Sequence, residues 1–310
     1  MKYNFCTLFD TAYLSRGLAM YDSLERHCKD FHLYIFAFDD NCYQTLKSIN
    51  KSHLTVISLS EFEDEELLKI KPERTKGEYC WTCTSSTILY ILNNFKVDNC
   101  TYLDADLYFF SSPQPLIEEM KDNSVMITEH RYTKKYDQSE KSGIYCVQFV
   151  TFKNDDRGLK VLIWWRNACI EWCYNRFEDG KFGDQKYLDD WTSRFEGIHV
   201  LQHLGGGVAP WNMQQYSFSK NGTEIVGKEI KTGKLFEVIF FHFHSLHFVN
   251  KNFFMPHPYY KNNRSAMMFM FKEYIKKIKE MRRIYNMSEH YMNFTDKLKL
   301  FTKWVAYKII

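Results

Sequence analysis

The sequence predicts an α/β protein with a mostly parallel central sheet and flanking helices. Three observations support this fold class. Apolar runs of strand length alternate with helical patterns through the first half of the chain, as they do in βαβ units. Acidic residues follow the ends of two of these runs, at the edge of the sheet where open α/β proteins bind ligands. The chain has 310 residues, 45% hydrophobic and 25% charged, which is enough for one large domain or two small ones.

The expected elements of the first half follow from hydrophobic spacing. They are a strand over 4 to 9, a helix from near 11, strands over 31 to 38 and 54 to 59, and a helix over 84 to 94. Ser60-Glu61-Phe62-Glu63 has the pattern of a capping box for a helix after the third strand. The last helix leads into the strand that carries Asp104 and Asp106.

The second half has a different character. Its expected elements are a strand over 145 to 152, a Trp-rich helix over 159 to 176, a glycine-punctuated turn over 178 to 185, a loop over 205 to 212 and a strand over 238 to 243. Three consecutive glycines in the loop allow close backbone approach to a ligand, although no phosphate-binding fingerprint accompanies them. Because no flexible linker is evident, we expect one body, divided into residues 1–260 and a C-terminal helical segment over 261–310.

Asp104 and Asp106 form the most informative motif of the chain. They interrupt the apolar run Tyr-Leu-Asp-Ala-Asp-Leu-Tyr-Phe-Phe, and in an extended segment both carboxylates point to the same side. Two carboxylates with a small residue between them suit Mg²⁺ or Mn²⁺, which take one or two protein carboxylates together with water and substrate phosphates. An isolated Asp-x-Asp is more often a solvated turn, so the strand context carries this prediction.

Charge is concentrated at the C-terminal end. Residues 271 to 310 hold ten Lys or Arg and four Asp or Glu, a net charge of +6, which leaves −3 for the preceding residues. Apolar and aromatic residues recur at helical spacing in the same segment. A basic amphipathic end predicts an anionic membrane surface as a partner, and the alternative is a helix packed on the core with a solvated basic face. Nucleic acid is not expected, because the rest of the chain is slightly acidic.

The cysteines and the N-terminal residues indicate a cytoplasmic protein. Nine cysteines without regular spacing fit free thiols in a reducing compartment, and no secretory leader pattern opens the chain. Cys80 and Cys83 make a C-x-x-C pair, but no second pair of metal ligands follows nearby.

Five motifs in this order resemble bacterial glycosyltransferases of the GT-A fold. They are Thr7-Leu-Phe-Asp with Tyr13-Leu-Ser-Arg-Gly, the Asp104-Ala-Asp106 motif, Gly183-Asp-Gln, Ala209-Pro-Trp-Asn and the late His242. The sequence is similar to the family 8 type and to nucleotide-diphospho-sugar transferases of surface-polysaccharide gene clusters, over roughly residues 3 to 250. The resemblance implies a Rossmann-like GT-A domain that uses a nucleotide sugar.

The resemblance also implies roles for individual residues. The donor-binding residues would be Thr7, Phe9, Asp10, Tyr13, Arg16, Asp104, Ala105 and Asp106. Asp104, Asp106 and His242 would hold Mn²⁺ or Mg²⁺, with His244 as an alternative ligand. Asp184 and Gln185 would lie near the transferred sugar as catalytic residues, and Trp211, Asn212 and Gly207 would contact the acceptor or sugar.

The chain departs from the family pattern at its late motif. Family 8 enzymes show His-x-x-Gly-x-x-Lys-Pro-Trp, whereas His242-Phe-His-Ser is followed by no Lys-Pro-Trp. The lysine that would hold the diphosphate is therefore unassigned, with Lys251 as a candidate substitute. Other interpretations stay open for single residues. Asp184 is also placed to cap a helix, His242 to be a core histidine and Trp211 to close a loop.

These observations predict a metal-dependent glycosyltransferase. Loss of a diphosphate leaving group needs a cation. A carboxylate such as Asp184 could stabilise the oxocarbenium-like transition state or deprotonate an acceptor hydroxyl, while Gln185 could only hydrogen-bond. We expect a nucleotide-sugar donor, a UDP-sugar first, and a glycan or lipid-linked acceptor of surface polysaccharide or lipopolysaccharide at the inner face of the membrane. The alternatives are a sugar-nucleotidyltransferase, which lacks its Gly-rich basic loop here, and a non-catalytic sugar-binding module.

Overall fold

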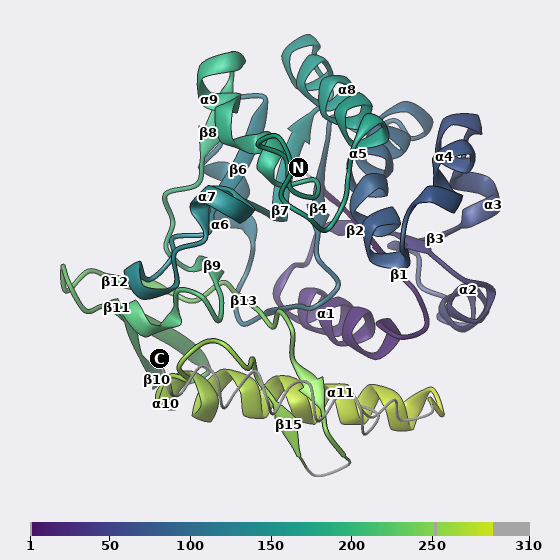
Figure 1. The fold of residues 1–310 in the computed structure, drawn as a ribbon. Coiled ribbons are helices and arrows are strands. Elements are labelled where there is room, and N and C mark those ends of the chain that lie inside the picture. Colours follow the sequence, from purple (N-terminus) through teal and green to yellow (C-terminus); the bar gives the residue numbers. More distant parts are fainter. Residues whose placement is uncertain (1, 251–252, 288–310) are drawn as a thin grey trace.

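A seven-stranded sheet forms the centre of the computed structural model, which describes residues 2–250 and 253–287 (Figure 1). The strand order is β3-β2-β1-β4-β7-β6-β8. The first four strands in this order are parallel, β7 runs antiparallel to both β4 and β6, and β8 is parallel to β6. The prediction of a mostly parallel sheet is therefore confirmed. The strands are β1 Tyr3–Phe9, β2 Phe31–Ala37, β3 Leu54–Ser58, β4 Asn99–Leu103, β6 Val125–Glu129, β7 Tyr145–Lys153 and β8 Ile198–Val200.

Helices cover both faces of this sheet (Figure 1). Strand β1 alternates its side chains between two cores, with Phe5 and Phe9 on the side of α1 (Leu14–His27) and Cys6 and Leu8 on the side of α5 (Lys76–Asn94) and α8 (Asp156–Glu171). This is why β1 has no polar face. Helix α1 lies close against the end of β1. The approach is so close that a Cβ on Gly17 would stand 2.4 Å from the Phe9 ring.

Apart from α11, the remaining elements are short. Helices are α2 Asp40–Lys47, α3 Leu59–Phe62, α4 Glu65–Ile70, α6 Gln114–Glu118, α7 Ser139–Ser142, α9 Trp191–Arg194, α10 Arg264–Ala266 and α11 Lys272–Ile284. 3₁₀ segments span Lys71–Glu73, Lys134–Tyr136, Lys186–Asp190 and Met213–Gln215, and a π-helical turn spans Met267–Phe271. The small sheets contain β5 Leu107–Phe109, β9 Gly206–Val208 and β13 Phe240–His242, then β10 Tyr216–Asn221, β11 Glu224–Glu229 and β12 Leu235–Glu237, and finally β14 His247–Phe248 and β15 Phe254–Met255.

Three helix starts differ from the expected ones because side-chain caps decide them. Helix α5 begins eight residues before the expected start at 84, since Thr75 and Glu78 form a capping box ahead of the apolar pattern. The box expected at Ser60 is formed instead by Ser58 and Glu61. Asp155 caps α8 through the Gly158 amide, so that helix spans Asp156–Glu171 instead of 159 to 176.

The triple glycine is a packing feature. A Cβ on Gly205 would stand 1.8 Å from the Glu237 carbonyl oxygen, and a Cβ on Gly206 would stand 2.8 Å from Leu116 and Leu201. Other groups therefore do approach the backbone of these glycines closely, but those groups are Glu237, Leu116 and Leu201 of the protein itself.

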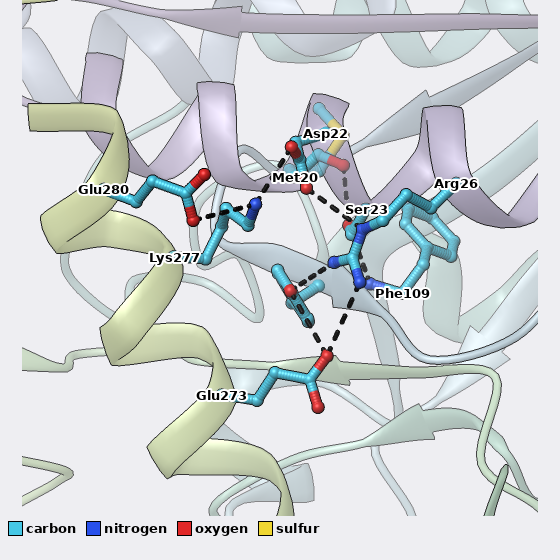
Figure 2. A network of polar contacts seen from close by, with 9 residues as sticks. Met20, Asp22, Ser23, Arg26, Phe109, Glu273, Lys277 and Glu280 are labelled. Carbon is cyan, nitrogen blue, oxygen red and sulfur yellow. Dashed lines mark hydrogen bonds and ion pairs between the residues drawn. The ribbon is translucent and has the colours of Figure 1, made fainter. Parts of the chain in front are cut away.

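The described part of the C-terminal segment packs on the core. Helix α11 lies along α1, and Tyr274, Ile278 and Met281 are buried between them and the small sheets. Figure 2 shows the polar contacts that join the two helices: Lys277 Nζ lies 3.1 Å from Asp22 Oδ1, and Arg26 Nη1 lies 3.6 Å from Glu273 Oε1. The apolar face expected over residues 271 to 285 is therefore packed inside the protein. The apolar residues expected from 298 onward lie outside the described residues. Over the residues that the structure describes, no helix combines the length and apolarity needed to cross a bilayer.

Candidate metal and substrate site

A cavity of about 670 Å³ opens at the carboxyl ends of β1 and β4. Such an edge is where ligands bind in open α/β sheets. Eleven of the residues that the sequence singles out line the cavity: Phe9, Asp10, Tyr13, Asp104, Ala105, Asp106, Asp184, Gln185, Trp211, His242 and His244. The structure therefore brings together motifs from the first, middle and late parts of the chain.

Asp104, Asp106 and His242 form a cluster whose ligand atoms all lie within 4.8 Å of one another. His242 Nε2 lies 3.1 Å from Asp106 Oδ1 and 3.6 Å from Asp104 Oδ2. His242 ends β13, which pairs antiparallel with β5 so that His242 stands opposite Leu107, directly after the acid pair. The pairing of β13 with β5 therefore delivers the histidine to the carboxylates.

The backbone around the acid pair differs from the extended segment expected there. Strand β4 ends at Leu103, and residues 104 to 106 form a turn closed by a hydrogen bond from the Leu107 amide to the Asp104 carbonyl, 3.2 Å long. The chain turns because β5 leaves the central sheet to pair with β13. The two carboxylates converge through this turn and not through strand alternation.

The charges of the cluster are interdependent. Burial on its own would lower the pKa of His242, but the Asp106 and Asp104 carboxylates outweigh it and hold that pKa well above the ordinary value. Burial acts to raise the pKa of Asp106, and the His242 imidazolium reverses this and holds it below its usual range. Burial raises the pKa of Asp104 to about 6, against the opposing effect of His242.

These residues fit a divalent cation. Without one, the imidazolium proton supplies the positive charge that the two carboxylates need. A cation in this place would be held by the carboxylates of Asp104 and Asp106 and the imidazole of His242, and it would supply the positive charge in place of the proton. Within the described residues, His244 is not part of the cluster, and its ring centre lies 5.6 Å from that of His242. The geometry favours His242 as the ligand.

Asp184 lines the same cavity as the cluster and is 6% exposed. Burial, and then the Asp104 carboxylate, raise its pKa to about 7. The 3₁₀ segment that follows has Gln185 at its cap position and no capping side chain, so Asp184 is not its N-cap. The Gln185 amide Nε2 donates to the Ser142 carbonyl, 2.7 Å away.

Trp211 both closes a loop and lines the cavity. Its indole Nε1 donates to the His130 carbonyl at 2.8 Å, and its ring meets that of His242 edge to face at 5.3 Å. The structure thus shows the loop-closing contact of this tryptophan, and its contact with a sugar stays a prediction.

Four candidate residues do not line the cavity. Thr7 is fully buried in β1, and the Arg16 guanidinium donates to the Leu246 carbonyl at 2.8 Å and lies over the Tyr13 ring. Asn212 is fully buried and holds the glycine loop by donating to the Gly207 and His130 carbonyls. These side chains support the residues that face the cavity.

Sequence reasoning missed several wall residues. The start of α5 contributes Lys76, Trp81 and Thr84, and the loops contribute Tyr132 and Phe182. It also missed Gln148, whose side chain contacts His242 from the middle of β7. A polar residue inside a strand that is otherwise buried on both faces was the available signal for Gln148.

Comparison with known proteins places this geometry in context. No protein-family model matches the chain. YfnD, an uncharacterized protein of Bacillus subtilis (strain 168), is 30% identical over 284 residues, which cover 89% of each chain. YfnF, an uncharacterized protein of the same strain, is 31% identical over 256 residues, covering 80% of this chain and 83% of YfnF.

Among solved structures, the galactosyltransferase LgtC in complex with donor and acceptor sugar analogs superimposes with a TM-score of 0.55 at 12% identity, covering 89% of this chain and 95% of LgtC. An active-site mutant of LgtC has the same TM-score and coverage at 10% identity. This likeness confirms the predicted GT-A fold, while the family 8 assignment stays a prediction. Since the identity to YfnD extends over 89% of the chain, the protein belongs to the family of YfnD and YfnF.

Proposed function

We propose that this protein is a metal-dependent glycosyltransferase that moves a sugar from a nucleoside-diphosphate donor, a UDP-sugar first, to a glycan or glycolipid acceptor. One observation carries the proposal: the buried Asp104-Asp106-His242 cluster opens into a cavity that also contains Asp184, at the carboxyl edge of a GT-A sheet. LgtC, which has the same fold, is a galactosyltransferase that has been captured with donor and acceptor sugar analogs.

In this proposal the cluster holds the cation beside the donor diphosphate. A bound Mn²⁺ or Mg²⁺ supplies positive charge that stabilises the leaving nucleoside diphosphate. Asp104, Asp106 and His242 fix that charge at the end of β4, and the base and ribose lie along Phe9, Asp10 and Tyr13 at the end of β1. Arg16 stabilises the Tyr13 ring from outside the cavity, with its guanidinium carbon 4.7 Å from the ring centre.

Asp184 faces the reacting sugar. With a pKa of about 7, it exchanges its proton near neutral pH, so it can accept the acceptor hydroxyl proton or stabilise an oxocarbenium-like charge when ionised. Gln185 can only hydrogen-bond, and its amide is already directed to Ser142. The rings of Trp81, Phe182 and Trp211 give the cavity apolar faces suited to sugar rings and exclude water from the leaving group.

Lys76 is the single lysine or arginine among the described residues that line the cavity. It lies in the first turn of α5, where the helix dipole also favours anions. Lys251, the candidate substitute for the family lysine, lies outside the described residues. We assign the additional positive charge toward the diphosphate to Lys76.

The acceptor side of the proposal concerns the membrane. Four exposed basic side chains form a stripe on the outer face of α11: Lys272, Lys276, Lys279 and Arg283. The apolar face of α11 is packed on the core, so adsorption to an anionic leaflet would rest on this basic stripe. This orientation suits a cytoplasmic enzyme that meets lipid-linked acceptors of surface polysaccharide or lipopolysaccharide at the inner face of the membrane.

Neutralising the basic stripe tests the membrane proposal without disturbing the core. Replacing its four residues by Gln should weaken sedimentation with vesicles rich in anionic lipid, since each cation contributes about 1 kcal/mol near such a surface. The matched control replaces four exposed lysines elsewhere by Gln: Lys96, Lys134, Lys135 and Lys160. Equal binding by both quadruple variants would exclude the stripe as the membrane contact.

A donor screen tests the catalytic proposal. Thermal unfolding is followed with UDP, GDP, CMP and dTDP, each with and without Mn²⁺, because a ligand at 100 times its Kd stabilises the fold by about 2.7 kcal/mol. We expect one nucleotide to stabilise the protein only when the metal is present, and the matching nucleotide sugar to be hydrolysed.

Asp104→Asn and Asp106→Asn should abolish both effects while the protein still folds. Full hydrolysis by both variants would exclude the cluster, and pyrophosphate release from a nucleoside triphosphate and a sugar phosphate would identify a nucleotidyltransferase instead.

A further inference from the structure

Gln148 contacts two of the three residues of the cluster. It lies in the middle of β7 and is fully buried. Its side-chain oxygen Oε1 lies 2.7 Å from His242 Nδ1, and its main-chain carbonyl accepts the Asp104 amide at 3.1 Å. Residues 94 positions apart in the sequence are joined by the first of these bonds. One residue therefore links the end of β4 to the end of β13.

The bond at Nδ1 determines how the imidazole can bind a cation. A neutral imidazole carries its single proton on one nitrogen, and the amide oxygen of Gln148 can only accept, so the proton resides on Nδ1. Nε2 then presents its lone pair toward Asp104 and Asp106, 3.6 and 3.1 Å away. Second-shell acceptors of this kind fix the tautomer and orientation of metal-binding histidines.

The Gln148–His242 pair has close neighbours on the backbone of Gly207 and the ring of Trp211. Gly207 lies behind it with φ +123, and a Cβ there would stand 3.0 Å from Thr128 Cγ2 and 3.3 Å from Gln148 Nε2. On the other side, the His242 ring is covered by the edge of Trp211. Gly207 and Trp211, which the resemblance associates with the sugar, thus pack against the Gln148–His242 pair.

A polar side chain at position 148 lowers the stability of the folded protein relative to an apolar side chain of similar size. Gln148 Nε2 is buried and has no hydrogen-bond partner within the described residues, and an unsatisfied buried amide is unfavourable where an apolar side chain of similar size would fit. The neutral amide also adds no negative charge beside Asp104, Asp106 and Asp184. Both facts favour a role for the Oε1 acceptor itself.

We propose that Gln148 is the positioning residue of the metal site, which sets the His242 tautomer and holds His242 in register with Asp104. The inference rests on the proposed metal-dependent function and names the residue that prepares its metal site before donor binds. Gln148 does not contact the reacting atoms, so its effect is on cation affinity.

Manganese binding measured without donor tests this role. Free Mn²⁺ is followed by electron paramagnetic resonance during titration of the wild type, Gln148→Met, Gln148→Glu and Thr151→Val. Met has similar volume but no acceptor, so we expect its Kd to rise roughly 10- to 100-fold. Glu keeps an acceptor at the same place and should restore affinity to within about threefold of the wild type or tighter. Thr151, buried in the same strand and hydrogen-bonded to Thr101 at 2.8 Å, is the matched control, and its variant should bind as the wild type does.

The outcomes separate the inference from the proposed function. Equal affinities of the wild type and Gln148→Met would refute the positioning role alone. A wild type that binds no Mn²⁺, with or without UDP, would refute both proposals. Should Gln148→Met fail to fold, ¹⁵N NMR of histidine in the Mg²⁺-loaded wild type gives the same answer: a proton on His242 Nδ1 supports the inference, and a proton on Nε2 overturns it.

Discussion

Replacing Asp184 by Asn should stabilise the protein and reduce its activity. The pKa of Asp184 lies at about 7 in the folded chain, against an ordinary value of 3.8, because the side chain is buried and faces Asp104. The folded state therefore prefers the protonated carboxyl, whose contribution to stability is complete below about pH 3.8 and is lost as the pH rises to about 7. Asn resembles the protonated form at every pH.

The magnitude follows from the size of the shift. Each pKa unit corresponds to about 1.4 kcal/mol, so a shift of about three units gives the Asn variant an advantage of about 4 kcal/mol at pH 8 and about 2 kcal/mol at pH 5. Urea unfolding at both pH values, in EDTA so that no cation neutralises Asp104, measures the difference. Asp190→Asn, an exposed carboxylate in the neighbouring 3₁₀ segment, is the control and should change stability by no more than about 0.5 kcal/mol.

The result that would refute this reasoning is an Asn variant whose advantage over the wild type is zero or does not grow between the two pH values. A stabilised variant with full transferase activity would instead confirm the electrostatics of Asp184 and exclude it from catalysis.

Two further predictions concern the residues around the late motif. His242→Ala should remove the stabilisation by Mn²⁺ in thermal unfolding, whereas His244→Ala should keep it, because only His242 belongs to the described cluster; the opposite pattern would assign the ligand to His244. Tyr274→Phe should stabilise the protein by about 1 kcal/mol in urea unfolding, since the buried hydroxyl has no partner among the described residues and the ring stack on Phe243, 3.8 Å between centres, is kept. A loss of stability in Tyr274→Phe would show that the hydroxyl is hydrogen-bonded.

Local patterns predicted the parts of the fold that local forces decide. The alternation of apolar runs and helical spacing gave β1 to β4 and α1, because each of these elements buries side chains on the central sheet. The start of α5 was misplaced because its first turn is capped and not apolar. The turn at 104 to 106 could not be predicted, since it depends on β5 pairing with β13 from the far end of the chain.

The residues of the candidate site also fall into those that the sequence could assign and those that it could not. Residue chemistry was enough to single out Asp104 and Asp106 as cation ligands, and the resemblance to GT-A glycosyltransferases added His242, which the structure places beside them. It was not enough to assign Thr7, Arg16 and Asn212, whose side chains lie behind the wall and not in it. Whether a side chain near a strand end faces the cavity depends on how neighbouring segments pack, and single-sequence patterns do not record that.

The dependence of the cluster on β13 has a consequence for biosynthesis. A nascent chain that has emerged only through β7 carries both aspartates but lacks His242, and the stack of Tyr274 on Phe243 further requires α11. Non-local contacts of this kind form late, after the loop entropy between them has been overcome. A chain that ends before β13 would thus bind its cation poorly, and cation binding would mark the molecules whose synthesis has passed β13.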